Sequence, residues 1–348
     1  MQHLSVKSLQ KLSTRILAAA GASEDEADII AQSLVASNLL GHDSHGVIRV
    51  EQYVRAIRSG SVNLGTEMEI FKETPTTLMV EGNWSFGQVI ARRSMEKAIE
   101  KAQQSGLVQL TVSGCYHIGR LGEYTQMAAE QGLVALLMAN GCGGANVAPF
   151  GGYGPRVATN PISFAAPWKD TFFLLDMTTS VAPEGKVRVR LNRGEALPEG
   201  WIVDSEGNKS TDPNDLYGPP AGVLLPLGGM MGHKGTALAL MIEIMGGILS
   251  RAGAARPGEK RIGNGIYAIL VKIEDLIPRE EFDRQLDETL NHIKSSPTLP
   301  GFEEILVPGE PEFRQKAIRE KEGIPIEDET WRQLVELAEE LGVVDGEW

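Results

Sequence analysis

The sequence predicts a mixed α/β (α+β) fold in which helical segments from both termini form one lobe beside a central α/β domain. The first 60 residues show helical periodicity, short β-rich runs begin near residue 68, and the charged tail from Arg279 is helical again. We therefore expect two domains. Residues 1–70 with 280–348 would form the helical lobe, and residues 71–279 the α/β domain.

The first 60 residues predict three helices. Apolar residues recur at helical spacing over 5–20. Ser23 followed by Glu26 is a capping box and predicts the start of a second helix. The segment 41–46 (GHDSHG) breaks the pattern, and helical periodicity returns over 47–57.

The middle of the chain alternates between strand and helix signals. The runs expected to be strands are TTLMVEG, LVQLTVSG, VALLMAN, ISFAAP, TFFLLDM and KVRVRL, with helices at 88–104 and 121–131. A long glycine- and proline-rich loop then leads to a short strand at 223–225. The apolar stretch 236–249 is too short to span a bilayer and predicts a buried helix, followed by a strand in GIYAILVKI.

The composition excludes several classes of protein. The 46 acidic and 33 basic residues give a net charge of -13, which disfavours nucleic-acid and anionic-membrane partners. The N-terminus lacks a long apolar segment, so we expect no secretory signal and a cytoplasmic location. Cys115 and Cys142 lack metal-ligand spacing, so we expect two reduced thiols and no metal site.

Glycine is enriched, at 39 of 348 residues or about 11%, against a usual ~7%. The nearest match to the dinucleotide motif G-x-G-x-x-G is GNGIYA at 263–268, and it runs into a strand where the motif needs a helix. The patterns G-x-x-x-x-G-K-[ST], H-E-x-x-H and G-x-S-x-G are absent. A nucleotide would therefore bind outside these motifs.

The cluster GHDSHGVIRVEQY is the first candidate site. His45, Arg49 and Tyr53 are spaced i, i+4, i+8, which places them on one face of a helix. Arginine offers a planar fork to a carboxylate, and histidine can take or return the proton of an alcohol. Ser44 could orient the imidazole. The alternative is a solvated helix face with a capping histidine.

Four more polar clusters lie beside predicted strands or helices. His117 follows a strand, and a loop with six glycines starts at residue 139. Asp176 ends an apolar run, and His233-Lys234 stands between glycines before an apolar helix. The alternatives are a packed histidine, an irregular loop and a turn-initiating aspartate. The His-Lys pair is costly to place there without a partner.

Together these clusters resemble the type 2 malate/L-lactate dehydrogenase family. That family includes ureidoglycolate, sulfolactate and 2,3-diketogulonate dehydrogenases and the piperideine/pyrroline-2-carboxylate reductases. The resemblance covers residues 5–342. Its motifs, in order, are DSHGVIR, YHIGRLGEY, APFGG with ATNPISFAAP, LLDMTTS with GK, LPEGWIVDSEGN with TDP, GHKGTALAL and VPGE.

The resemblance implies NAD(P)-dependent oxidoreduction of a 2-hydroxy acid/2-keto acid pair. The alternative within the family is reduction of a cyclic imino acid, and the alternative outside it is a non-catalytic ligand-binding protein. The implied fold is a non-Rossmann NAD(P)-binding mixed-sheet domain with a helical substrate and dimer lobe. A homodimer with active sites near the subunit contact is also implied.

The resemblance also assigns roles to individual residues. The catalytic candidates are His45, Ser44, His117 and Asp176. The substrate-binding candidates are Arg49, Tyr53, Thr159 and Lys186. The cofactor-binding candidates are His117, Asn140, Asn160, Asp176, Met177, Thr178, His233, Lys234 and Gly235. His45 and His117 both remain candidates for the proton-transferring group.

The sequence departs from the family pattern at three places. Ala158 replaces a usual glycine, and Thr236 replaces an aromatic residue. After VPGE the family often carries arginines near the cofactor phosphate, but here Pro311 and Glu312 follow. Because an acidic side chain would repel a 2′-phosphate, the sequence favours NAD over NADP.

Overall fold

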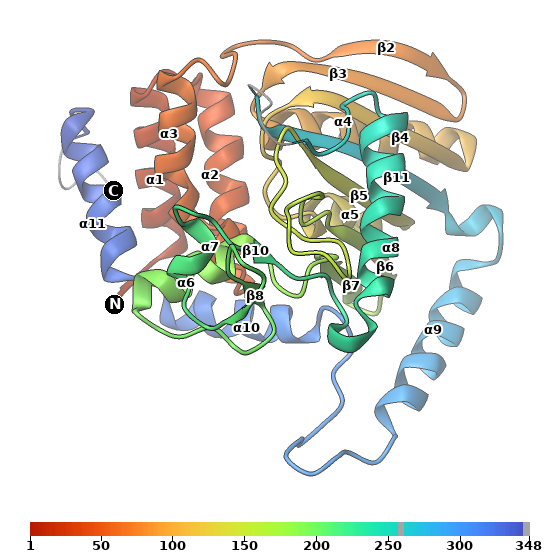
Figure 1. Ribbon diagram of the computed structural model, residues 1–348. Coiled ribbons are helices and arrows are strands. Elements are labelled where there is room, and N and C mark those ends of the chain that lie inside the picture. The colour runs from red at the N-terminus through yellow and green to blue at the C-terminus, as the bar shows by residue number, and fades with distance from the viewer. Residues whose placement is uncertain (257–260, 344–348) are drawn as a thin grey trace.

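A computed structural model describes residues 1–256 and 261–343 and is built around a seven-stranded mixed sheet (Figure 1). The strand order is β2-β3-β4-β11-β5-β6-β7. The strands are β2 (Glu69–Thr74), β3 (Thr77–Ser85), β4 (Leu107–Cys115), β11 (Gly263–Lys272), β5 (Leu133–Cys142), β6 (Ile162–Trp168) and β7 (Thr171–Met177). Only β3 and β4 pair in parallel in this sheet; its other neighbours are antiparallel.

Helices cover both faces of this sheet, as the alternation of side chains along β11 shows. Ile266, Ala268 and Leu270 belong to a core cluster with α4 (Gly87–Ser105) and α5 (Gly122–Glu130). Tyr267 and Ile269 point the other way and pack with Ile242 of α8 (His233–Ile242). The predicted strand in GIYAILVKI is thus confirmed, and the GNG sequence before it lies inside β11.

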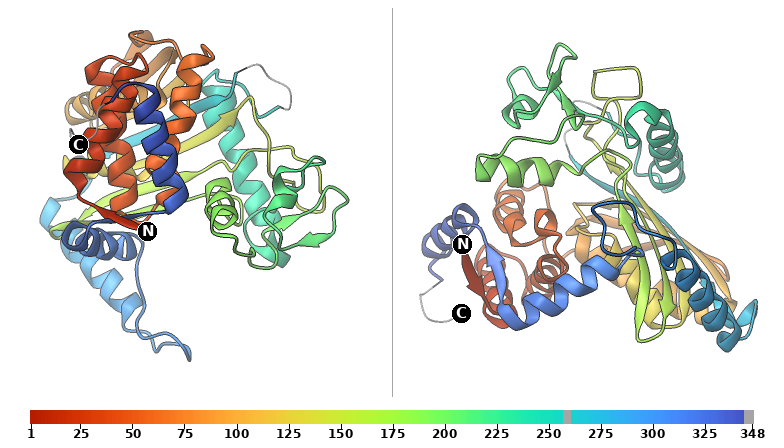
Figure 2. Two further views of the ribbon diagram at one scale, coloured as in Figure 1. Left: turned by 90° about the vertical axis from the view of Figure 1, so that its left-hand side faces the viewer. Right: turned by 90° about the horizontal axis from the view of Figure 1, so that it is seen from below.

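Both chain ends contribute to the helical lobe. Its helices are α1 (Val6–Ala19), α2 (Glu24–Leu39), α3 (Val50–Arg58) and α11 (Asp328–Glu340), and β1 (Gln2–Leu4) pairs with β12 (Ile324–Ile326). One hydrophobic cluster extends from Leu9 to Val343, and Figure 2 shows α11 beside the N-terminal helices. The predicted capping box is present, with Ser23 and Glu26 each accepting a backbone hydrogen bond from the other.

Part of the C-terminal segment lies elsewhere. Helix α9 (Arg279–Lys294) packs through Leu290 against Trp168 of β6 instead of joining the helical cluster. Helix α10 (Glu310–Glu322) then returns the chain to α2. The last five residues assigned to this lobe, 344–348, lie outside the described residues.

The predicted strand KVRVRL is wrong, because this segment lies in helix α6 (Glu184–Arg193). Alternation over six residues also fits a narrow helical stripe, and Val187 is the one apolar side chain here that is fully buried. Gly194, with a φ of +66°, ends the helix. The following loop forms β8 (Ile202–Val203), β9 (Lys209–Ser210), α7 (Asn214–Tyr217) and β10 (Val223–Leu224).

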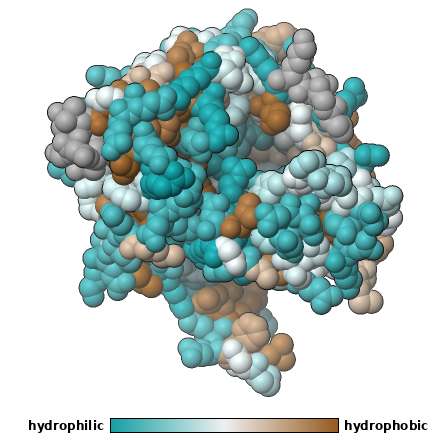
Figure 3. All heavy atoms as spheres, turned by 60° about the vertical axis from the view of Figure 1, so that its left-hand side comes forward, coloured by the Kyte–Doolittle hydropathy of each residue, from teal (hydrophilic) through white to brown (hydrophobic). Residues whose placement is uncertain are grey.

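The apolar stretch before residue 250 is helical, as predicted, but it is not buried. Helix α8 continues as a π-helical segment, Glu243–Leu249, and about half of each of the Leu240, Ile244 and Ile248 side chains is exposed. The face in Figure 3 is largely hydrophilic, with a protrusion at its lower edge. The loop after α9 also exposes Leu299 and Phe302. No helix within the described ranges is long and apolar enough to cross a membrane.

Candidate active site

A cavity of about 1030 Å³ lies where the helical lobe, one end of the sheet and helix α6 meet. Nine of the residues predicted for the site line it: Ser44, His45, Arg49, His117, Thr159, Asp176, Met177, Thr178 and Lys186. Six others are not among the described residues that line it: Tyr53, Asn140, Asn160, His233, Lys234 and Gly235. The cavity therefore brings together residues that are up to 142 positions apart, from Ser44 to Lys186.

The spacing predicted that His45 and Arg49 lie on one continuous helix, and this prediction is wrong. Their segment forms two short 3₁₀ turns, Asp43–His45 and Val47–Arg49, before α3 begins. The side chain of Asn38 sets this shape, since its Oδ1 accepts from the Val47 amide at 2.8 Å. A Cβ on Gly46 would lie 2.2 Å from that oxygen, so only glycine fits. The turns still direct His45 and Arg49 into the cavity.

Arg49 is held from three sides and is only 7% exposed. Its Nε donates to the Ser44 carbonyl oxygen at 2.7 Å, and Nη1 donates to Gln52 Oε1 at 2.8 Å. Its Nη2 lies 3.4 Å from Glu184 Oε2 on helix α6. These contacts fix the guanidinium at the cavity wall while leaving some of its five N–H groups for a ligand.

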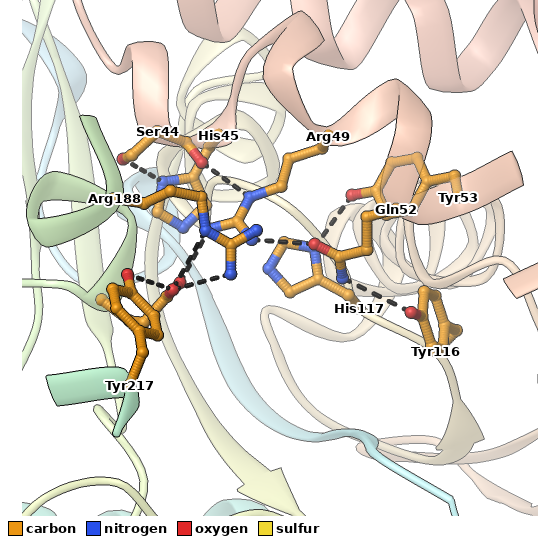
Figure 4. Close-up of polar contacts among 10 residues, drawn as sticks. Ser44, His45, Arg49, Gln52, Tyr53, Tyr116, His117, Arg188 and Tyr217 are labelled. Atoms are coloured by element: carbon orange, nitrogen blue, oxygen red, sulfur yellow. Dashed lines mark hydrogen bonds and ion pairs between the residues drawn. The ribbon is translucent and has the colours of Figure 1, made fainter. Parts of the chain in front are cut away.

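The two histidines stack on each other, with ring centroids 5.8 Å apart and planes inclined by 17°. Ser44 Oγ lies 3.0 Å from His45 Nδ1, and Tyr53 Oη lies 2.9 Å from His117 Nδ1 (Figure 4). With both Nδ1 atoms engaged, each ring has only Nε2 left for a ligand.

Burial keeps both imidazoles neutral. Burial, together with the Arg49 charge, lowers the pKa of His117 to about 3. Burial and Arg49 also lower the pKa of His45 well below its usual value. Both rings are therefore uncharged at neutral pH.

Tyr53 does not face the cavity, in contrast to its predicted contact with substrate. Its side chain is completely buried behind His117, and its oxygen accepts a hydrogen bond of 2.6 Å from Gln88 Nε2. Burial raises the pKa of its phenol. The geometry therefore makes Tyr53 a support for His117.

Asp176 and Arg120 form a second polar centre at the end of β7. Asp176 Oδ2 accepts from the Gly122 amide at the start of α5 at 2.7 Å. Arg120, which the sequence analysis did not single out, places Nη1 3.7 Å from the same oxygen and is 4% exposed. Its Nε and Nη1 have no hydrogen-bond partner among the described residues. Arg120 lies in the motif YHIGRLGEY, three residues after His117, and this position could have identified it as a site residue.

Asn140 and Asn160 belong to a buried network and not to the cavity wall. Glu243 accepts from Asn160 Nδ2 at 2.8 Å, from Asn140 Nδ2 at 3.3 Å and from the Ala255 amide at 2.9 Å. This network ties the helix after α8 to β5 and to the loop before β6. It thereby fixes Thr159, the neighbour of Asn160, at the cavity.

His233, Lys234 and Gly235 lie at the start of α8, outside the cavity. His233 packs edge-on against Phe150 with ring centroids 5.8 Å apart, and Lys234 is exposed. A Cβ on Gly235 would lie 2.4 Å from the carbonyl oxygen of Leu227, which lines the cavity. Gly235 therefore serves close packing of the helix start against that wall.

Glu184, Arg188 and Tyr217 were also missed by the sequence analysis. Glu184 Oε1 accepts from Tyr217 Oη at 2.9 Å and from Arg188 Nη2 at 2.7 Å. Burial would raise the pKa of Glu184, but the charges of Arg49 and Arg188 bring it below its usual value. Arg188 escaped notice because its segment was predicted to be a strand, and Tyr217 because it was assigned to the long loop that follows. In the described part of the chain, no group of His, Cys, Asp and Glu side chains is arranged to hold a metal ion.

Comparison with known proteins gives one consistent result. The family model described as malate/L-lactate dehydrogenase matches residues 4–335. The chain is 40% identical to malate dehydrogenase of Pyrococcus horikoshii over 94% of this chain and 92% of that protein. It is 36% identical to L-sulfolactate dehydrogenase of Methanocaldococcus jannaschii, over 96% of each chain.

The solved structures agree with the sequence comparison. The P. horikoshii malate dehydrogenase structure superposes with a TM-score of 0.89 and 37% identity, covering 99% of this chain and 96% of that one. The M. jannaschii sulfolactate dehydrogenase structure gives a TM-score of 0.85 and 34% identity, covering 98% of each chain.

Proposed function

Because the chain belongs to the malate/L-lactate dehydrogenase family and is an oxidoreductase of hydroxy acids, we propose that it transfers hydride between NAD(P) and a small 2-hydroxy acid/2-keto acid pair. The observation that supports this proposal most strongly is the stacked, neutral pair of His45 and His117 beside Arg49 in one cavity. Proton-transferring groups and a carboxylate-binding group then meet at one point.

The cavity fits a nicotinamide cofactor. At about 1030 Å³ it matches the upper end of the usual ~300–1,000 Å³ for ligand pockets, which leaves room for a second, small molecule. The buried Arg120 Nε and Nη1, which have no hydrogen-bond partner among the described residues, suit an acceptor group of the cofactor. Thr159, Asp176, Met177 and Thr178 would hold the nicotinamide end, outside any Rossmann pattern. When bound, the cofactor supplies the hydride chemistry.

The hydrogen bonds of the two histidines favour different roles. Gln88 donates to the Tyr53 oxygen, so the phenol proton is left for His117 Nδ1. Neutral His117 then carries its own proton on Nε2, where it can donate to the substrate oxygen.

His45 can take the complementary role. Ser44 Oγ can accept from His45 Nδ1, which leaves a lone pair on His45 Nε2. We propose that His45 Nε2 accepts the proton of the substrate hydroxyl as hydride leaves the substrate, while Arg49 binds the substrate carboxylate.

We propose NAD as the preferred cofactor. Glu312 Oε1 lies 3.6 Å from Nε2 of His42, a residue that lines the cavity. The contact with His42 lowers the pKa of Glu312, so this carboxylate is ionised at neutral pH. A negative charge at this edge would repel the 2′-phosphate of NADP. Glu312→Gln should therefore lower the KM for NADPH more than the KM for NADH.

We also propose a homodimer. Helix α8 and its π-helical continuation expose a row of apolar side chains, including Leu240, Ile244 and Ile248. A row of exposed apolar side chains along one helix favours a protein–protein interface. A second copy of the chain is the partner that this proposal requires.

The test of the proposed function is a direct assay. NADH fluorescence is measured on mixing with protein, and NADH and NADPH oxidation is then followed with pyruvate, oxaloacetate and a cyclic imino acid, each against a blank without protein. Oxidation that depends on a 2-keto acid is expected. Binding of neither cofactor and turnover of no substrate would refute the proposal and favour a non-catalytic ligand-binding protein.

A further inference from the structure

One carboxylate in the cavity wall bridges two arginines from different parts of the fold. Glu184 Oε2 faces Arg49 of the helical lobe at 3.4 Å, and Glu184 Oε1 accepts from Arg188 Nε at 3.2 Å and Nη2 at 2.7 Å. Figure 4 shows the two guanidinium groups converging there. Since both contact one carboxylate, they lie close enough for a four-carbon acid with an anionic group at each end to reach both.

The two arginines differ in how much of each is still available. Arg49 is almost fully enclosed, whereas the Arg188 side chain is 39% exposed and lines the cavity. The two hydrogen bonds from Arg188 to Glu184 are donated by Nε and Nη2, so Nη1 is not used for that carboxylate. Arg188 can therefore keep Glu184 and still donate to a ligand.

The charge of the cavity wall points to an acidic ligand. The lining includes five basic side chains, Arg49, Arg55, Arg120, Lys186 and Arg188, and three acidic ones, Glu51, Asp176 and Glu184. The whole chain, in contrast, carries a net charge of -13. With His45 and His117 neutral, this local excess of positive charge favours a ligand that carries more than one negative charge.

We propose that Arg188 binds the distal acid group of a dianionic 2-keto or 2-hydroxy acid, while Arg49 binds the carboxylate next to the reacting carbon. This inference rests on the proposed function and narrows its substrate class to dicarboxylates and sulfo-carboxylates. Glu184 keeps the two guanidinium groups apart and in place before the substrate arrives. A substrate with a methyl group at the distal position gains nothing from Arg188.

The experiment compares Arg188→Met with Arg190→Met on the same helix. Arg190 contacts Glu195, the Ala196 carbonyl and Trp201, and it is not among the described lining residues. Steady-state kcat/KM is measured with NADH for oxaloacetate and sulfopyruvate as dianions and for pyruvate and 2-oxobutanoate as monoanions.

In Arg188→Met, kcat/KM for the dianions should fall ~10–100-fold, and that for the monoanions should change by less than about 3-fold. Arg188→Lys should restore part of the loss, and Arg190→Met should leave the dianion preference intact. An equal loss on both substrate classes, or the same loss of preference in Arg190→Met, would overturn the role of Arg188. A wild-type enzyme that oxidises neither NADH nor NADPH with any of these acids would instead overturn the proposed function itself.

Discussion

Tyr53 and His117 are 64 positions apart in the sequence, yet the phenol oxygen of Tyr53 lies 2.9 Å from His117 Nδ1. The contact sets which nitrogen of the His117 ring reaches the cavity. It also explains why a fully buried tyrosine stands beside the site without touching the ligand space.

Tyr53→Phe should lower kcat by ~10-fold or more with little change in the affinity for NADH, because His117 loses the group that orients its ring. Steady-state kinetics and NADH fluorescence titration measure the two effects. Tyr267→Phe is the control, since its hydroxyl contacts Gln109 on the neighbouring strand β4. An unchanged kcat in Tyr53→Phe would show that His117 needs no such support.

The two histidines should respond differently to substitution. His45→Ala should lower kcat by ~10²–10⁴-fold and remove the histidine-dependent part of the pH–rate profile, because it is assigned the proton transfer. His117→Ala should lower kcat but keep that part of the profile. Cofactor binding should persist in both variants. A profile that disappears in His117→Ala and not in His45→Ala would reverse the assignment.

Stability should fall in acid because His117 is buried neutral. Its pKa in the folded protein is about 3, below the value of about 6.5 in the unfolded chain. The unfolded chain therefore binds a proton that the folded protein does not, and stability is lost as pH falls from about 6.5 towards 3. As pH falls, the free energy of unfolding should decrease less in His117→Asn than in wild type, and the two should differ by up to about 1.4 kcal/mol per pH unit. Urea unfolding from pH 7.5 to 4.5 checks this, and parallel curves would contradict it.

The buried Glu243 should be essential for stability. Glu243→Ala removes the shared acceptor of Asn140, Asn160 and the Ala255 amide, and should lower the free energy of unfolding by about 3 kcal/mol. The two asparagine side chains keep only their second acceptors, the Gly253 and Ala239 carbonyl oxygens. The exposed Glu274→Ala should change it by less than about 0.5 kcal/mol. Urea unfolding compares the two. Equal effects would mean that this network does not hold the helix to the sheet.

The exposed row on α8 should hold two copies of the chain together. Leu240→Glu combined with Ile244→Glu should halve the mass measured by light scattering, because a charge in an apolar interface is costly. Leu276→Glu, at a side chain that is 74% exposed and distant in sequence, is the control. A wild-type mass of 37.7 kDa would refute the dimer, and a dimer that survives the double substitution would place its interface elsewhere.

Local sequence patterns predicted most of the helices and strands. The capping box at Ser23 and the strand in GIYAILVKI are confirmed, since each depends on residues a few positions apart. KVRVRL was misread because six alternating residues fit both a strand and a helical stripe. The apolar stretch before residue 250 was read as buried, because hydropathy alone does not show which faces have neighbours.

The sequence by itself determined the family, the elements and the residue types that suit hydroxy-acid chemistry, because motifs and periodicity are properties of short segments. The tertiary structure decided which of these side chains share one cavity. It moved Tyr53 behind His117, placed Asn140 and Asn160 in the Glu243 network, and brought Glu184 and Arg188 to Arg49. These relationships join residues that are distant in the chain, and only the packing of the helical lobe, the sheet and α6 against one another sets their distances.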